Sequence, residues 1–182
     1  MEITSYYLKD VCKIYSGGTP STKKQEYWDG NYHWLSSGET KNDFIEKTER
    51  TITKEGIENS STKLAKKNMV VMASAGQGFT RGQVSFLNID TYVNQSLLVF
   101  STNKEKLLSL YLYYNLKMRY KELRQLSDSS SIRGSLNKAN ISKFNINLPS
   151  IDNQEKIVKL LHNIDQKIII NQKINNKISL FV

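Results

Sequence analysis

The C-terminal segment of the chain, residues 151–182, carries its clearest alternation of apolar and polar positions. Apolar residues recur there at intervals of four and three, and two asparagines complete the series: Ile157, Leu161, Ile164, Ile168, Asn171, Asn175, Ile178 and Val182. This spacing places them along one side of a single helix, as in the seam of a coiled coil. Such a helix would be roughly 45 Å long.

The sequence also marks the start of this helix. Pro149 ends the preceding segment, and Asp152 followed three residues later by Glu155 has the spacing of a capping box, so we expect Asp152 to be the N-cap. A small domain cannot bury the apolar stripe of so long a helix, which favours a coiled coil with a second chain. The alternative is a C-terminal helix that folds back on its own domain.

Shorter apolar runs in the first part of the chain predict strands. Residues 69–73 predict a short buried strand, and residues 83–87 predict a strand that follows the glycine-spaced segment 74–82. Residues 92–100 predict a further strand, polar at its start and apolar at its end. Residues 141–148 alternate apolar and polar positions, as a half-buried strand does.

Helical spacing is strongest over residues 107–126. Five large side chains of this segment share one face of the predicted helix: Leu108, Leu112, Leu116, Tyr120 and Leu123. Residues 54–60 predict a short helix, preceded by a strand at 50–53. The elements together predict an α+β fold, with a mixed globular domain over residues 1–149 and a long coiled-coil helix over residues 150–182.

An aromatic segment near the N-terminus contains a predicted turn. The dipeptide Asp29-Gly30 lies between aromatic flanks and predicts the turn of a β-hairpin. We expect Trp28 and Trp34 to lie in the core, as large aromatic residues usually do. His33 has no cysteine or second histidine near it in sequence, so we interpret it as structural or solvent-facing rather than as a metal ligand.

Charge points to a polyanionic partner. The net charge of the chain is +9, and residues 151–182 hold five lysines against three acidic residues, so the preceding domain carries +7. A basic domain whose loops are rich in Ser, Thr, Asn and Gln suggests a polyanion, most simply nucleic acid. Double-stranded DNA is the partner that we expect. A single cysteine argues against a disulfide framework and favours the cytoplasm. No apolar run reaches membrane-spanning length, so no membrane partner is expected.

Four loops rich in glycine and hydroxyl groups are the candidate DNA contacts, at residues 18–24, 36–41, 74–81 and 129–133. Glycines allow left-handed angles or a close approach of the backbone to a ligand. The first loop lacks the Gly-Lys-Ser/Thr ending of a nucleotide-binding loop, so contacts to DNA phosphates are favoured there over a plain turn. The candidate DNA-binding residues are Gly18, Thr19, Ser21, Lys23, Lys24, Ser36, Ser37, Lys41, Ser74, Gly76, Gln77, Arg81, Ser130 and Arg133.

Three of these side chains are the candidates for reading bases. Gln77 can form a pair of hydrogen bonds with an adenine edge, and Arg81 or Arg133 can do so with a guanine edge. Lysines and backbone amides are expected to contact phosphates instead.

A catalytic alternative rests on Asp29, Glu39 and Lys41. Their order and spacing fit the loose Asp…Glu-x-Lys arrangement of many magnesium-dependent nucleases, in which the carboxylates hold the metal ion. The arrangement is short and arises often by chance, and it lacks a proline before the aspartate.

Three stretches of the chain, in the same order and with similar spacing, resemble the specificity subunit of type I restriction-modification systems. The first is Leu8-x-Asp10-Val11 with Gly18-Thr19-Pro20-Ser21, Glu26-Tyr27-Trp28-x-Gly30 and Trp34; the second is Ala75-Gly76-x-Gly78 with Asn94-Gln95; the third is Leu148-Pro149-x4-Gln154-x2-Ile157-x3-Leu161-x2-Ile164-Asp165. The resemblance spans nearly the whole chain. It implies a DNA target-recognition domain followed by a spacer helix.

The resemblance also implies partners and cofactors. A usual specificity subunit has two such domains and two helices packed antiparallel, so a second copy of this chain is expected to supply the missing half, unless the chain is the truncated product of a rearranging locus. A methyltransferase subunit would bring S-adenosylmethionine, and a restriction/translocase subunit would use ATP and Mg²⁺. This chain is expected to bind none of these cofactors.

The chain is therefore interpreted as a non-catalytic, sequence-specific DNA-recognition subunit. Its only prolines, Pro20 and Pro149, lie outside any Asn/Asp-Pro-Pro-aromatic loop of the kind that a DNA adenine methyltransferase needs. Dimerisation is expected through Ile157, Leu161, Ile164, Ile168, Asn171, Asn175 and Ile178, to read a two-part palindromic site. The alternatives are the magnesium-dependent endonuclease and a coiled-coil adaptor that does not contact DNA.

Overall fold

The computed structural model of the chain describes residues 2–76, 78–128 and 135–178, with side chains described up to residue 175. Its elements follow one another as β1 (Ile3–Tyr7), α1 (Leu8–Val11), β2 (Cys12–Ser16), the 3-10 helix η1 (Gln25–Tyr27), β3 (Trp28–Leu35), the 3-10 helix η2 (Ser37–Lys41), β4 (Phe44–Ile45), β5 (Arg50–Ile52), α2 (Lys54–Glu58), β6 (Lys63–Ala65), β7 (Val70–Ala73), β8 (Val84–Leu87), β9 (Thr91–Val93), β10 (Leu97–Thr102), α3 (Ser109–Met118), α4 (Tyr120–Asp128), α5 (Lys138–Ser142), β11 (Asn145–Pro149) and α6 (Ile151–Ile178). The α+β class and the long C-terminal helix are confirmed.

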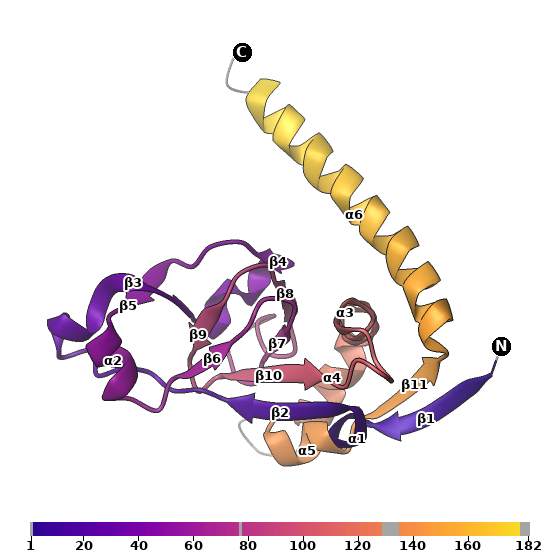
Figure 1. The fold of residues 1–182 in the computed structure, drawn as a ribbon, viewed down its shortest axis with the longest axis horizontal. Coiled ribbons are helices and arrows are strands. Elements are labelled where there is room, and N and C mark those ends of the chain that lie inside the picture. The colour runs from indigo at the N-terminus through magenta and orange to yellow at the C-terminus, as the bar shows by residue number, and fades with distance from the viewer. Residues whose placement is uncertain (1, 77, 129–134, 179–182) are drawn as a thin grey trace.

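Three sheets make up the β structure of the described residues. A five-stranded sheet has the order β2-β10-β7-β8-β4, a four-stranded sheet has the order β5-β3-β9-β6, and β1 pairs with β11 as a separate antiparallel ribbon. Strands β7 and β8 are buried along their whole length, which explains why the sequence predicts them well. The ribbon joins the two ends of the domain beside the start of α6 (Figure 1).

The main core lies between the five-stranded sheet and helices α1, α3 and α5. Phe100 from β10 and Tyr113 and Leu116 from α3 are fully buried in it. Burying side chains of this size stabilises the fold by about 1.5–3 kcal/mol each. Cys12 lies in the same core, and burial raises the pKa of its thiol to about 12, so this cysteine stays protonated and unreactive.

The aromatic segment forms one bulged strand, and the hairpin predicted at Asp29-Gly30 is wrong. Trp28 and Tyr32 both pair with Ile52 of β5, so the residues between them loop out of the ladder. Asp29 adopts a left-handed φ of 59°, and a side-chain carbon at Gly30 would lie 2.6 Å from the Ile52 carbonyl oxygen. The Asp-Gly pair therefore builds a bulge, and the strand continues beyond it.

Trp28 and Trp34 are buried, as predicted. Their rings meet edge to face, with centroids 5.1 Å apart, in a small core of the four-stranded sheet. His33 lies beside them on β3, where its Nδ1 is 3.0 Å from the Thr48 hydroxyl oxygen.

Three segments predicted as single elements are divided in the structure. The predicted strand 92–100 becomes β9 and β10, because the Asn94 side chain accepts a hydrogen bond from the Ser96 backbone and turns the chain. The predicted helix 107–126 becomes α3 and α4, which meet at Arg119. The predicted strand 141–148 is helical at its start, because Asn137 caps α5 by accepting from the Asn140 backbone.

Helix α6 leaves the domain and projects away from it (Figure 1). It begins at Ile151, so Asp152 lies in its first turn and is not the N-cap. Gln154 is fully buried at its base, where its side chain accepts from the Leu108 backbone and donates to the carbonyls of Lys106 and Pro149. No helix within the described ranges is long and apolar enough to cross a membrane.

Candidate functional site

The turn between β9 and β10, residues 94–96, is hydrogen-bonded to two of the predicted DNA-contacting loops, the first and the third. The Thr19 hydroxyl of the first loop donates to Gln95 Oε1 at 2.6 Å. The Ser74 backbone at the start of the third loop donates to the Ser96 carbonyl at 2.8 Å, and Leu136, just beyond the fourth loop, donates to the Ser74 carbonyl at 2.8 Å. Segments far apart in sequence thus meet around one turn.

The second loop contacts the chain just after the third loop. The Thr40 hydroxyl lies 3.4 Å from Gln83 Oε1, just after the third loop. Sequence reasoning missed the role of the turn, because Asn94-Gln95-Ser96 resembles the polar start of a strand. The signal that could have revealed this turn is the interruption of an otherwise apolar run by three polar residues.

The loop at residues 18–24 is held by the two buried tryptophans. Trp34 Nε1 donates to the Gly18 carbonyl at 3.3 Å, and Trp28 Nε1 donates to the Ser21 carbonyl at 3.1 Å. A side-chain carbon at Gly17 would lie 2.0 Å from the Val93 carbonyl oxygen, and one at Gly18 would lie 2.0 Å from the Ser61 hydroxyl. The glycines thus serve close packing within the domain, and contact of this loop with DNA stays a prediction.

Lys24, at the end of this loop, has partners of its own. Its ammonium donates to the Tyr27 hydroxyl at 2.8 Å, and this hydrogen bond raises the pKa of Lys24 above its ordinary value. Glu26 lies 3.9 Å away as a weak ion pair. Lys24 is therefore positively charged at neutral pH, and its ammonium group already contacts Tyr27 and Glu26.

The second loop is built on a capping box that engages Glu39 completely. Glu39 is buried, its Oε1 accepts from the Ser36 backbone at 2.9 Å, and its Oε2 accepts from the Glu49 backbone at 2.8 Å. Lys41 is exposed and pairs with Glu49. The Glu39 carboxylate, one of the two in the nuclease alternative, thus already accepts hydrogen bonds from the backbone of the domain. Among the described residues, no group of three His, Cys, Asp or Glu side chains could hold a metal ion.

The third loop is braced against helix α4. The Tyr120 hydroxyl donates to the Phe79 carbonyl at 2.7 Å, and Arg124 donates to the Gly78 carbonyl at 2.9 Å. Arg81 is buried and forms an ion pair with Asp128 at the end of α4. The guanidinium predicted to read a guanine is therefore engaged within the domain and would have to leave Asp128 to reach a base.

The remaining predicted residues fall into three groups by exposure. Exposed to solvent are Ser21, Lys23, Lys24, Lys41 and Gly76. Half-buried are Thr19, Ser36, Ser37 and Ser74, while Gly18 and Arg81 are buried. Gln77, Ser130 and Arg133 lie outside the described residues.

Helix α6 uses one face to dock on its own domain. The Tyr114 hydroxyl of α3 donates to Asp165 at 2.8 Å, and the His162 ring meets Phe44 with centroids 5.9 Å apart. Burial, together with the Asp165 carboxylate, raises the pKa of Tyr114 above its ordinary value. The helix is thus fixed at Gln154 and again three turns later.

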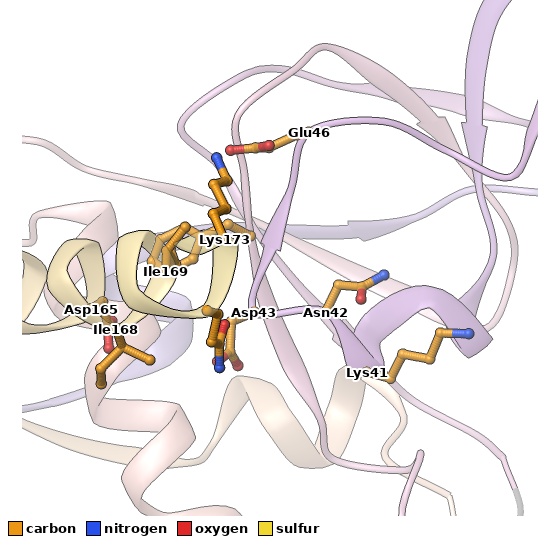
Figure 2. Close-up of a pocket in the computed structure, with 10 residues that line it drawn as sticks. Lys41, Asn42, Asp43, Glu46, Asp165, Ile168, Ile169 and Lys173 are labelled. Atoms are coloured by element: carbon orange, nitrogen blue, oxygen red, sulfur yellow. The ribbon is translucent and has the colours of Figure 1, made fainter. Parts of the chain in front are cut away.

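Beyond these contacts, a groove of about 320 Å³ separates α6 from the segment around β4. Figure 2 shows Lys173 of α6 extending toward Glu46, whereas Lys41 points away from the helix. The groove is lined mainly by charged and amide side chains.

A second face of α6 is apolar and exposed. Leu160, Ile164 and Ile168 are 64%, 47% and 48% exposed, and they follow the predicted seam or lie beside it. Ile168 lies at the edge of this face and also lines the groove (Figure 2). Ile157 and Leu161 of the seam are half-buried, and Asn171 and Asn175 are exposed. The side chain of Ile178 lies outside the described residues.

Comparisons with known proteins agree with this fold. Residues 2–180 match the family described as the type I restriction modification DNA specificity domain. The chain is 28% identical over 161 residues to the type I restriction enzyme EcoR124I/EcoR124II specificity subunit of Escherichia coli, covering 87% of this chain and 40% of that protein. It is also 28% identical over 176 residues to the MjaIX specificity subunit of Methanocaldococcus jannaschii, covering 94% and 39%.

Solved structures show the same architecture. The HsdS subunit from Thermoanaerobacter tengcongensis matches with a TM-score of 0.71 at 17% identity, covering 94% of this chain and 39% of that one. The S subunit from M. genitalium matches with a TM-score of 0.71 at 13% identity, covering 94% and 41%. The chain thus spans about two fifths of the length of these relatives, and it belongs to the family of type I restriction-modification DNA specificity domains.

Proposed function

We propose that this chain reads a DNA sequence for a type I restriction-modification complex and performs no chemistry itself. The observation that supports the proposal is the turn 94–96 of this basic chain, which is hydrogen-bonded to the first loop through Thr19 and to the start of the third loop through Ser74. Loops held by a rigid scaffold are the usual carriers of recognition, because their side chains can vary while their positions stay fixed.

Phosphate contacts are proposed for the exposed lysines of the loops. Lys23→Ala and Lys41→Ala should each weaken binding to target and random DNA by the same factor, and each should lower the salt dependence of binding by about one counterion. Lys159→Ala, an exposed lysine on α6, makes the same charge change outside the loops and should leave binding unchanged.

The test of sequence reading uses the chain together with its methyltransferase subunit. Methylome sequencing of cells that carry both genes gives the target, and titrations then compare target with random duplex at one salt concentration. We expect at least about a thousandfold preference for the target. Equal affinity for both duplexes would refute sequence reading.

The exposed face of α6 supports a second part of the proposal, which is assembly with a second copy of the chain. Apolar side chains of this size gain from burial, and an antiparallel pair related by a two-fold axis buries the same face of both copies. Two identical recognition domains at opposite ends of such a spacer would read a two-part palindromic target. A methylome with an asymmetric two-part target, in cells where this is the only specificity chain, would contradict that arrangement.

The cofactors are proposed to bind the partner subunits and not this chain. S-adenosylmethionine is proposed to reside on the methyltransferase subunit, and ATP with Mg²⁺ on a restriction/translocase subunit. Equilibrium dialysis of the isolated chain with S-adenosylmethionine should give no binding, whereas the assembled complex should bind it.

A further inference from the structure

Phe79 is an apolar side chain held out in solvent by a braced loop. It is 81% exposed, the highest exposure among the large hydrophobic residues of the described chain. Its carbonyl accepts from Tyr120, and the adjacent Gly78 takes a left-handed φ of 59° while its carbonyl accepts from Arg124. The loop therefore fixes the position of Phe79 through its own backbone.

A cavity of about 340 Å³ lies beside this side chain, where the second and third loops meet. Phe79, Val84 and Tyr120 give it apolar and aromatic walls, while Thr40 and Gln83 add groups that form hydrogen bonds. Its volume lies within the range of about 300–1,000 Å³ that is typical of small-ligand sites.

Charged groups also line the cavity. Lys41 and Lys117 border it, and Asp43, which pairs with Lys117 at 2.7 Å, is the acidic residue of the lining. The combination of an aromatic face, hydrogen-bonding edges and lysines matches the parts of a nucleotide: a π-face, a polar base edge and a phosphate.

We propose that this cavity accepts one unstacked nucleobase of the DNA target and that Phe79 stacks on it. The proposal rests on the DNA-reading function proposed above and adds a contact site to it. The base must be unstacked, because in an intact duplex both faces of every internal base are covered by neighbouring base pairs. Apolar side chains that part a base step, and pockets that hold a single extruded base, are both known forms of DNA recognition.

Phe79 can be removed without disturbing the core, because most of its surface already faces water. Base–aromatic stacking contributes about 1–3 kcal/mol per base, so Phe79→Ala should weaken binding of the intact target roughly 5- to 150-fold. Phe79→Trp keeps a stacking face and should retain most of the affinity. Met118→Ala is the matched control, because Met118 is 80% exposed but does not line the cavity.

The decisive experiment measures binding of the assembled methyltransferase complex to duplexes in which each base of the mapped target is removed in turn. At one position the abasic duplex should bind wild type and Phe79→Ala equally, because the stacking partner is already gone. At all other positions the variant should remain weaker by the factor found on the intact target.

Three results would overturn the proposal. Phe79→Ala could bind the intact target as tightly as wild type does, or its deficit could persist at every abasic position. The variant could also lose the methyltransferase subunit in sedimentation without DNA, which would identify Phe79 as a protein contact. Failure of the wild-type complex to prefer its target would instead refute DNA reading itself, so the two failures are distinguishable.

Discussion

Pairing through α6 can be tested by placing charge on its exposed apolar face. Ile164 and Ile168 are each about half exposed, so a partner helix can still cover roughly half of each side chain. Full burial of an isoleucine is worth about 1.5–3 kcal/mol, and the remaining half is worth about 0.7–1.5 kcal/mol. The double variant Ile164→Asp/Ile168→Asp removes four such contributions from a symmetric dimer, a loss of about 3–6 kcal/mol.

That loss corresponds to a dissociation constant raised by two to four orders of magnitude. Sedimentation equilibrium over a wide concentration range, with and without the methyltransferase subunit, should therefore show a self-associating wild type and a monomeric double variant. Circular dichroism should show little change in helix content, because both side chains are about half exposed in the single chain.

A matched pair of single variants locates the contact face. Ile168 and Ile170 are similarly exposed, at 48% and 53%, but two positions along a helix they point to nearly opposite sides. Ile168→Asp should weaken association and Ile170→Asp should not. Equal effects of the two variants, or a wild type that remains monomeric at micromolar concentration both alone and with its methyltransferase, would refute the reasoning.

Three further predictions concern the domain. Because Arg81 is already paired, we expect Arg81→Ala to weaken target and random DNA binding equally in titrations, whereas a selective loss of about 1–3 kcal/mol on the target would show that it reads a guanine. Glu39→Ala should lower the free energy of unfolding in urea by about 1–3 kcal/mol, and magnesium-dependent DNA cleavage that disappears in this variant would revive the nuclease alternative. Because the pKa of Tyr114 is raised in the folded chain, the unfolded chain loses the phenolic proton at lower pH than the folded chain does. The contribution of Tyr114 to the free energy of unfolding should therefore be constant just below pH 10 and fall above it. Urea titrations should show a steeper fall for wild type than for Tyr114→Phe.

The sequence was most informative where burial alone decides structure. The run at 69–73 is apolar because both faces of its strand are covered, and the strands at 69–73 and 83–87 formed within a residue of the predicted ends. The helix from Ile151 was equally clear from its period. These signals are local, so a single sequence contains them.

The predictions from sequence were wrong where a single polar side chain changes the direction of the backbone. Asn94 and Asn137 each accept a backbone hydrogen bond and start a turn or a helix, and neither role was predicted from the sequence. The pairing of β1 with β11 joins residues from opposite ends of the domain and leaves no local trace. The same holds for the ion pair between Arg81 and Asp128, which a reading of each loop by itself could not anticipate.

The turn at 94–96 has a consequence for how such a protein changes its target. The bonds from Ser74 to Ser96 and from Leu136 to Ser74 join backbone atoms, as do those from Gly17 and Gly18 to the end of β9. Backbone bonds do not depend on which side chains the loops carry. If the loops read DNA as proposed, substitutions in them can alter the bases that are read while the loops keep their places, so that new specificities arise without a new fold.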